Sequence, residues 1–315
     1  MSSWILPEGI SDLTGDSALL VENNRRSLLD LYKSLGYEFV IPPIIENIES
    51  LLLTSKEVDK KTFKFLDPTS GDLIAVHSDI TPQIARIDAM RSTDEVEKYC
   101  YVNSIVQTQV DDFYASRSPI QVGAELYGDN SYKADIEIID LMLKSLESIK
   151  LNNLIVNIGN VKIFNLLAKK VNLDEDDLKQ LSLIFARRSK PDLADFVKKS
   201  SKDLSLFSTL INLEGDSSVL SLATEYFKDD KDIINCIKEI QEIGKHFEDK
   251  GYKVMYDLAE LKTYGYHTGL IFSVFNDTFK KVIANGGRYN GIGKVFGMER
   301  PATGFSFDLK YLSQV

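Results

Sequence analysis

Apolar and polar residues alternate most regularly between positions 99 and 128, where the chain reads YCYVNSIVQTQVDDFYASRSPIQVGAELYG. The first half is mainly apolar, the middle is polar, and every second residue from Ile120 to Leu126 is apolar. A period of two is typical of a β-strand whose side chains point alternately to its two faces. The pattern therefore predicts a long antiparallel hairpin with its loop across residues 109–118, and it places Gln121 and Glu125 on one face of the second strand.

A carboxamide and a carboxylate on the same face of a sheet have two interpretations. In the first, the face is solvated, which is ordinary for polar side chains. In the second, Gln121 and Glu125 bind a small polar ligand whose ammonium or ring N–H groups these oxygen acceptors satisfy. Periodicity alone does not choose between the two.

Helical spacing of apolar residues, capping residues and turn signals predict the other elements. Helices are expected at 14–35, 47–56, 81–90 and 134–149. Strands are expected at 37–41, 154–158, 252–258, 269–275 and 279–284. A second hairpin is expected at 63–76, with its turn at 67–72, and residues 303–312 are expected to form a strand that runs into a short helix.

Residues 161–248 differ in character, because they are rich in Leu, Lys and Asp, have helical periodicity and show almost no strand signal. We interpret them as a helical insertion. Strands separated by helices, with hairpins in the middle and near the end, predict an α+β fold in which helices flank an antiparallel sheet. The expected division is a core fold at 1–160 and 249–315, interrupted by the insertion at 161–248.

Composition excludes several classes of function. The 315 residues are 43% hydrophobic and 27% charged, and the formal net charge is −10. These values are ordinary for a globular protein, but the acidic balance argues against binding a phosphate backbone as the main activity. Apolar runs are all shorter than the roughly 20 residues of a membrane span, and the N-terminus lacks signal-peptide character. A cytoplasmic protein without a membrane segment is expected.

Cysteine, histidine and glycine patterns point to neither a metal nor a nucleotide cofactor. Two cysteines, Cys100 and Cys236, are too few for a disulfide framework, and both are predicted to be reduced core thiols. The three histidines form no zinc-binding pattern. The glycine-rich passage 286–297 has neither the spacing of a P-loop nor the strand–helix context of a dinucleotide site. We expect no bound metal and no cofactor.

Six stretches, taken in order, resemble a known family. Residues 34–47 (SLGYEFVIPPIIEN), 76–86 (VHSDITPQIAR), the predicted hairpin and 304–312 (GFSFDLKYL) are similar to the signature blocks of class II histidyl-tRNA synthetases. Residues 258–272 (LAELKTYGYHTGLIF) and 284–291 (ANGGRYNG) resemble the two histidine-specific blocks of that family. The resemblance implies a class II aminoacyl-tRNA synthetase-like sheet, and it covers the chain except for the helical insertion.

The nucleotide-handling positions depart from the synthetase pattern. Gln107 stands where synthetases hold the ATP α-phosphate with an arginine, and Asp308 and Tyr311 replace a glycine and a second arginine. Charge-assisted phosphate contacts are worth roughly 1.5–3 kcal/mol each, so ATP binding and adenylate chemistry are expected to be lost. The sequence also stops a few residues after this block, so we expect no anticodon-binding domain and no tRNA binding.

The amino-acid pocket keeps the family pattern. By resemblance, Asp79, Thr81 and Gln121 receive the α-ammonium of histidine, and Glu125 faces the imidazole. Lys262 stands where synthetases have an arginine near the α-carboxylate, and it would lack the bidentate fork of that arginine. The full set of residues that the resemblance implies for histidine binding is Asp79, Thr81, Gln121, Glu125, Lys262, Tyr266, His267 and Tyr289. Arg117 and Arg288 are expected to be ion-pair partners within the fold.

A synthetase body with a histidine pocket and without ATP chemistry is similar to the regulatory subunits of short-form ATP phosphoribosyltransferase, the first enzyme of histidine biosynthesis. The resemblance implies a non-catalytic subunit that activates the short catalytic subunit and mediates feedback inhibition by L-histidine. It further implies a homodimer through the first signature block, within a hetero-oligomer that contains the catalytic chains. Gln107 and Lys262 depart even from this family, where arginine is usual at both positions.

Two other functions compete with this prediction. One is a histidine-activating ligase or aminoacyl transferase that acts on a non-tRNA acceptor, which would require ATP. The other is an amino-acid-binding protein that has no enzyme partner. Histidine-dependent pyrophosphate exchange would favour the first, and failure to bind a catalytic phosphoribosyltransferase would favour the second.

Overall fold

The predicted central hairpin is confirmed as the antiparallel pair β5 (Glu97–Ser104) and β6 (Ile120–Tyr127). It belongs to a computed structural model that describes residues 4–52, 56–110, 116–261 and 267–314. The pairing places Tyr101 directly opposite Gly123. Directly opposed residues in an antiparallel pair share one face of the sheet. Since every second residue of β6 shares that face, Tyr101 lies on the same side as Gln121 and Glu125.

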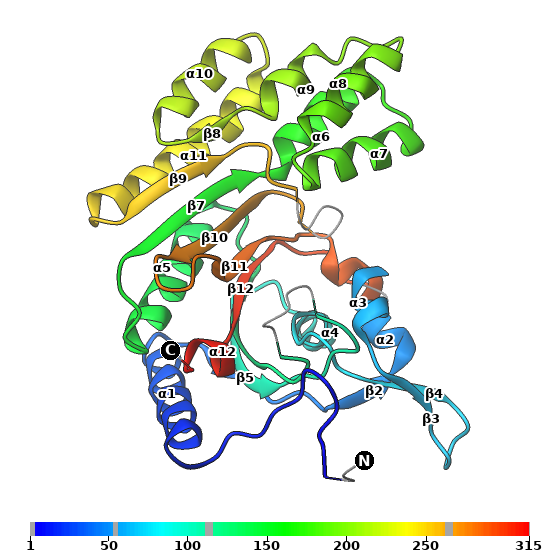
Figure 1. The fold of residues 1–315 in the computed structure, drawn as a ribbon, viewed down its shortest axis with the longest axis vertical. Helices are drawn as coiled ribbons and strands as arrows, with labels where there is room; N and C mark the ends of the chain where they lie inside the picture. The colour runs from blue at the N-terminus through cyan, green and yellow to red at the C-terminus, as the bar shows by residue number, and fades with distance from the viewer. Residues whose placement is uncertain (1–3, 53–55, 111–115, 262–266, 315) are drawn as a thin grey trace. The chain divides into compact units, whose positions relative to one another are not determined.

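The chain divides into two compact units, which we describe separately. The first contains Met1–Asn130, Ile138–Asn152 and Asn290–Val315. Its main strands run in the order β1-β5-β6-β12. A small antiparallel sheet has the order β2-β4-β3, and Figure 1 shows it in blue to cyan. The bounds of the strands not yet given are β1 (Glu38–Phe39), β2 (Ile45–Asn47), β3 (Lys64–Leu66), β4 (Leu73–Val76) and β12 (Ala302–Asp308).

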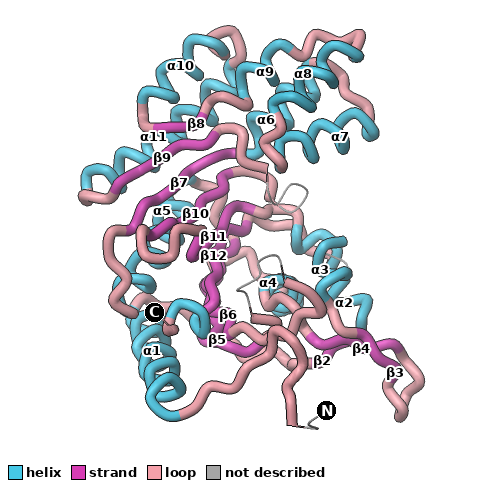
Figure 2. Tube along the Cα trace, viewed as in Figure 1, coloured by secondary structure: helices cyan, strands magenta, loops and turns pink. Residues whose placement is uncertain are grey.

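Helices pack against these strands in the first unit. Helix α1 contacts β1, β5 and α12, and α4 contacts β6; Figure 2 shows the long α1 in cyan. Gly36 follows α1 with a positive φ of 82°, as predicted for a left-handed residue after the last helical turn. The helices are α1 (Gly15–Ser34), α2 (Ile48–Leu52), α3 (Lys56–Lys61), α4 (Thr81–Arg91), most of α5 (Tyr132–Ser148), the 3-10 helix η1 (Ile292–Phe296) and α12 (Leu309–Leu312).

The second unit contains Ser131–Glu137 and Asn153–Tyr289. Its strands run in the order β11-β10-β7-β9-β8, and α11 contacts β7 and β9. Figure 1 shows the helices from α6 to α11, coloured green to yellow, beside β8 and β9. The strands are β7 (Leu154–Asn160), β8 (Glu214–Gly215), β9 (Lys253–Asp257), β10 (Leu270–Asn276) and β11 (Val282–Arg288); the helices are α6 (Val161–Lys170), α7 (Glu175–Ala186), α8 (Lys190–Lys199), α9 (Ser205–Leu210), α10 (Ser218–Tyr226) and α11 (Lys231–Asp249).

Three expectations are corrected in detail. The sheet is mixed rather than purely antiparallel, because β1 pairs with β5 and β7 pairs with β9 in parallel. The strand expected at 279–284 is β11 (Val282–Arg288), which continues through Gly286 and Gly287. The single helix expected at 47–56 is instead the two helices α2 and α3, with residues 53–55 outside the described chain.

Other sequence predictions agree with the structure. The α+β class is confirmed, and Cys100 and Cys236 are both buried free thiols. The hairpin at 63–76 is formed by β3 and β4. Residues 161–248 are mainly helical, although the compact unit that contains them also contains β7, β9, β10 and β11. The predicted domain boundaries stay a prediction. No helix in the described ranges has the length and apolar character needed to cross a membrane.

Candidate functional site

Four of the eight predicted histidine-binding residues meet in the first unit. Gln121 and Glu125 lie on β6, Thr81 is the first residue of α4, and Asp79 lies in the segment that joins β4 to α4. With Tyr101 they form a hydrogen-bonded group that we call the polar cluster, defined as Asp79, Thr81, Tyr101, Gln121 and Glu125. The contact between α4 and β6 brings Thr81 of the cluster close to Gln121 and Glu125.

Gln121 and Asp79 fix one end of the polar cluster. The side-chain Nε2 of Gln121 donates to Asp79 Oδ1 at 2.8 Å, and its Oε1 accepts from the backbone N–H of Ile80 at 3.0 Å. The backbone N–H of Thr81 donates to the same Asp79 oxygen at 3.2 Å. These bonds orient the half-buried Asp79 carboxylate.

Glu125 lies at the other end and is only 1% exposed. Its Oε1 accepts from the hydroxyl groups of Thr81 and Tyr101, each at 3.0 Å. Burial raises the pKa of Tyr101 well above its ordinary value, and the nearby Glu125 carboxylate acts in the same direction. The phenol therefore stays protonated and donates. A buried carboxylate held in this way is a strong acceptor for the N–H groups of a ligand.

Sequence reasoning missed Tyr101 of the polar cluster and the role of the neighbouring Gly123, on which the position of Tyr101 depends. A Cβ at position 123 would collide with the Tyr101 hydroxyl and would lie 2.6 Å from the carbonyl oxygen of Phe305. Only glycine therefore lets the tyrosine ring cross the strand between Gln121 and Glu125. The available signal was a glycine between two polar residues on one strand face, which leaves room for a large side chain from the neighbouring strand.

The other four predicted residues are not tested by this geometry. His267 and Tyr289 lie in the second unit, where their rings form an edge-to-face pair with centroids 6.4 Å apart. The His267 ring lies against Gly287, where a Cβ would be 2.9 Å from its Nε2. Lys262 and Tyr266 lie outside the described residues. Their roles in histidine binding stay predictions.

The nucleotide-handling positions of the first unit have taken up internal bonds. Gln107 Nε2 donates to the backbone carbonyl of Ser78 at 3.1 Å. Asp308 caps α12, since its Oδ1 accepts from the backbone N–H of Tyr311 at 3.3 Å and from that of Ile120 at 3.2 Å. Burial raises the pKa of Asp308. The acidic side chain at this position is half-buried.

The two arginines noted in the sequence have different roles. Arg288 forms a buried ion pair with Asp135, at 2.9 Å between Nη2 and Oδ2, as expected. Arg117 instead lies over the ring of Phe63, 5.3 Å from its centroid, and its Nε donates to the carbonyl of Gln107 at 3.1 Å. Its guanidinium is thus engaged by an aromatic ring and by backbone oxygens. Among the described residues, no group of three or more His, Cys, Asp or Glu side chains could hold a metal ion.

Comparisons with known proteins agree on one family. The Histidyl-tRNA synthetase family model matches residues 9–312. An ATP phosphoribosyltransferase regulatory subunit from Thiobacillus denitrificans is 39% identical over 99% of this chain and 98% of its own length. A protein of the same name from Methylobacillus flagellatus is 39% identical over 98% of this chain and 81% of its own length.

Solved structures share the fold. An ATP phosphoribosyltransferase regulatory subunit/histidyl-tRNA synthetase from Bacillus halodurans superposes with a TM-score of 0.89 at 23% identity, covering 100% of this chain and 83% of that one. A chain of the ATP phosphoribosyl transferase (HisG:HisZ) complex from Thermotoga maritima gives a TM-score of 0.70 at 18% identity, covering 91% and 96%. These similarities confirm the predicted class II synthetase-like α+β fold.

Proposed function

This chain belongs to the histidyl-tRNA synthetase-like family of ATP phosphoribosyltransferase regulatory subunits, and we propose that it assembles with a catalytic chain of that transferase and makes its activity responsive to L-histidine. The chain is a non-catalytic regulatory subunit, and the family assigns it to histidine biosynthesis. We further propose that L-histidine is the effector, that it binds at the polar cluster, that it inhibits the complex, and that the chain forms a homodimer. A cytoplasmic location stays a prediction.

One observation carries the proposal of histidine as effector. The acceptors of the polar cluster are intact and pre-oriented by hydrogen bonds, whereas the positions that would handle ATP bind the backbone instead. A free amino acid with an ammonium group and a ring N–H matches the two carboxylates of the cluster, Asp79 and Glu125. ATP, with about four negative charges, does not match the half-buried Asp308 carboxylate.

Inhibition requires that histidine distinguish two states of the complex. A ligand shifts an equilibrium only by its difference in affinity for the two states. A tenfold preference at each site corresponds to about 1.4 kcal/mol of coupling. We propose that histidine bound at the polar cluster favours the less active state of the assembly, as expected for feedback by the end product of the pathway.

An exposed apolar strip in the first unit supports the proposed homodimer. It lies in the first signature block, between β1 and the start of β2, and Ile41 alone is 68% exposed. Contiguous apolar residues on a surface are typical of a protein contact. The residues of this strip are Phe39, Ile41, Ile44 and Ile45. We expect Ile41→Glu to shift the chain from dimer to monomer in sedimentation, whereas Leu222→Glu, at a separate exposed apolar position in the second unit, leaves it dimeric.

Reconstitution tests the regulatory function. The chain is co-expressed with a short catalytic ATP phosphoribosyltransferase, and the rate of phosphoribosyl transfer is measured with and without L-histidine. We expect the complex to be more active than the catalytic chain alone and to be inhibited by histidine. The Glu125→Gln complex should stay active but lose sensitivity to histidine. A complex that ignores histidine would remove the effector proposal, and histidine-dependent pyrophosphate exchange by the isolated chain would favour a ligase instead.

A further inference from the structure

His77 lies at the centre of a buried hydrogen-bond network in the first unit. It follows β4 directly, two residues before Asp79 of the polar cluster, and its side chain is fully buried. The ring Nδ1 lies 2.7 Å from Oε1 of Gln83 on α4, and Nε2 lies 2.8 Å from the backbone carbonyl oxygen of Ser104 at the end of β5. Both ring nitrogens of this histidine therefore face an oxygen atom.

The orientation of the Gln83 amide is fixed by its other two contacts. Its Nε2 donates to the backbone carbonyl of Pro43 at 2.7 Å and to Oε1 of Glu46, on β2, at 3.0 Å. A backbone carbonyl and an ionised carboxylate can only accept, so an amide turned the other way would place its own oxygen against two acceptors. Gln83 is only 1% exposed, which makes such a mismatch costly. The atom of Gln83 that faces His77 is therefore its oxygen.

Two acceptors leave one protonation state of the ring that has a donor for each contact. A neutral imidazole has one N–H group and one bare nitrogen in either tautomer. The bare nitrogen of His77 would then lie 2.7 or 2.8 Å from an oxygen with no proton between them. Burial alone favours the neutral ring, but this ring would leave one buried acceptor pair unmatched. The imidazolium has two N–H groups, and both contacts become charge-assisted hydrogen bonds.

The charged groups around the network also favour a cation at His77. The charged residues of the three elements that bond to His77 or Gln83 (β2, α4 and β5) are Glu46, Arg86, Asp88, Arg91, Glu97 and Lys98. Glu46 binds Gln83 and pairs with Arg86, whereas the other four are engaged elsewhere. Asp79 adds a carboxylate two residues from His77. Two carboxylates and one guanidinium leave one unbalanced negative charge, which an imidazolium neutralises.

From this arrangement we infer that His77 is an imidazolium in the folded chain, and that this buried cation positions the segment that carries Asp79 and Thr81. The backbone of His77 is bound as well, since its N–H donates to the carbonyl of Ile44 at 2.9 Å and its carbonyl accepts from Val106 N–H at 3.2 Å. His77 thus joins the first signature block, α4 and the end of β5 just before the polar cluster. Its effect on L-histidine binding rests on the proposed function, but its charge and its positioning role do not.

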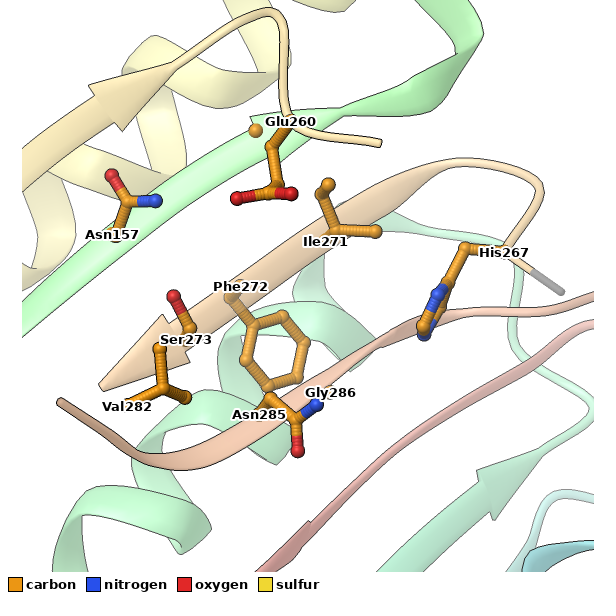
Figure 3. A pocket seen from close by; sticks show the side chains of 10 residues that line it. Asn157, Glu260, His267, Ile271, Phe272, Ser273, Val282, Asn285 and Gly286 are labelled. Carbon is orange, nitrogen blue, oxygen red and sulfur yellow. The ribbon is translucent and has the colours of Figure 1, made fainter. Parts of the chain in front are cut away.

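NMR of the full chain labelled with nitrogen-15 in histidine measures the protonation of the ring directly. The chain has three histidines: besides His77, His246 lies on α11, and His267 borders a cavity of about 70 Å³ in the second unit (Figure 3). His246→Gln and His267→Gln assign two of the three rings, and the third is His77.

The decisive measurement is made on the wild-type chain at pH 7.5. An ordinary histidine side chain is mostly neutral at this pH, because its unperturbed pKa is about 6.5. We expect both ring nitrogens of His77 to carry a proton, each with its own one-bond coupling to hydrogen. One protonated and one bare nitrogen would overturn the inference, and this result does not depend on the folding of a variant at position 77.

Two substitutions test the positioning role. Glutamine has one donor group and cannot donate on both sides, whereas arginine is always charged and has N–H donors in fixed, diverging directions. The readout is hydrogen exchange of the Ile80 backbone N–H, which donates to Gln121 Oε1 at 3.0 Å, relative to that of Ile158 on β7 in the second unit. We expect His77→Gln to lower the relative protection of Ile80 about tenfold or more, and His77→Arg to keep it within about threefold of the wild-type value.

Equal protection of Ile80 in the wild-type chain and in His77→Gln, or an equal loss in both variants, would overturn the positioning role. His246→Gln is the control and should leave Ile80 unchanged. Under the proposed function, the affinity for L-histidine should fall in His77→Gln in parallel with the protection of Ile80. A wild-type chain that does not bind L-histidine would remove the proposed function, whereas the ring protonation and the exchange of Ile80 would still decide the role of His77.

Discussion

Two regions of the first unit, one expected to face an amino acid and the other a nucleotide, have opposite arrangements. The polar cluster holds two carboxylates, Asp79 and Glu125, which hydroxyl and amide donors orient. At the nucleotide positions, Gln107 and Asp308 bind backbone groups of the protein itself. The first region is therefore joined by bonds among its own side chains, and the proposed function gives its two carboxylates to a ligand, whereas the residues of the second region bind the backbone.

Under the proposed function, this difference is how a synthetase fold loses a reaction and keeps a sensor. Replacing cations that hold phosphate removes contacts worth roughly 1.5–3 kcal/mol each. The replacing residues have structural roles. Asp308 caps α12, and Gln107 binds the backbone of the segment before α4.

The largest expected effect comes from disturbing the strand between the two acceptors of the cluster. Gly123→Ala would place a Cβ 2.6 Å from the carbonyl oxygen of Phe305 and against the Tyr101 hydroxyl. Because a backbone carbonyl cannot move away easily, we expect a loss of about 3 kcal/mol or more in the free energy of unfolding. Denaturant unfolding measures it.

Gly291→Ala is the control for this substitution. No atom lies within 4 Å of a Cβ at Gly291, and its φ is −88°, so the change in stability should stay within about 0.5 kcal/mol. Equal stability of the two variants would contradict the position of the Tyr101 ring over Gly123.

The next effect is on binding rather than on folding. Glu125→Gln replaces an acceptor carboxylate by an amide that also carries donors, so an imidazole N–H of histidine is poorly matched. We expect histidine affinity to fall by about 1.5–3 kcal/mol, or roughly 10-fold to 150-fold. Calorimetry measures this loss, with Glu147→Gln, an exposed acid on α5, as the control. If Glu125→Gln binds histidine like the wild-type chain, the polar cluster is not the histidine site.

The smallest expected effect is on the pH dependence of folding stability, and it comes from Asp308, one of the nucleotide positions. Burial raises the pKa of Asp308 above its ordinary value of 3.8, so the folded chain binds the proton more tightly than the unfolded chain. This residue therefore favours folding most below pH 3.8, and its contribution falls as the pH rises through the raised pKa. Asp308→Asn keeps an acceptor oxygen but has no titrating carboxyl group. The stability of this variant should therefore not fall through the same change of pH.

Thermal unfolding across this range of pH tests the prediction. The wild-type chain should lose stability relative to Asp308→Asn as the pH rises from about 4 to 7. Asp308→Ala should be less stable than both at every pH, because the N–H groups of Ile120 and Tyr311 lose their acceptor. A constant difference between wild type and Asp308→Asn would show that the carboxyl group titrates alike in the folded and unfolded chains.

Local patterns in the sequence predicted much of the fold. Period-two alternation located β6, the Asp67–Asp72 turn located the hairpin of β3 and β4, and proline in the first turn located the start of α4. Parallel pairing was not predictable in this way. The β1–β5 and β7–β9 pairs join segments far apart in the chain, and the periodicity of one strand carries no information about its distant partner.

The sequence likewise identified one part of the candidate site and missed another. The shared face of Gln121 and Glu125 follows from their spacing, and Asp79 and Thr81 were identified by resemblance. Tyr101 was not identified, because its role depends on the register that places it opposite Gly123.

Calorimetric titration of the isolated chain with L-histidine and, separately, with ATP tests the central claim most directly. A cluster that keeps amino-acid acceptors beside positions that have lost phosphate contacts predicts micromolar binding of histidine, roughly −7 to −8 kcal/mol, and no heat from ATP. Binding of ATP, or no binding of histidine, would contradict the account.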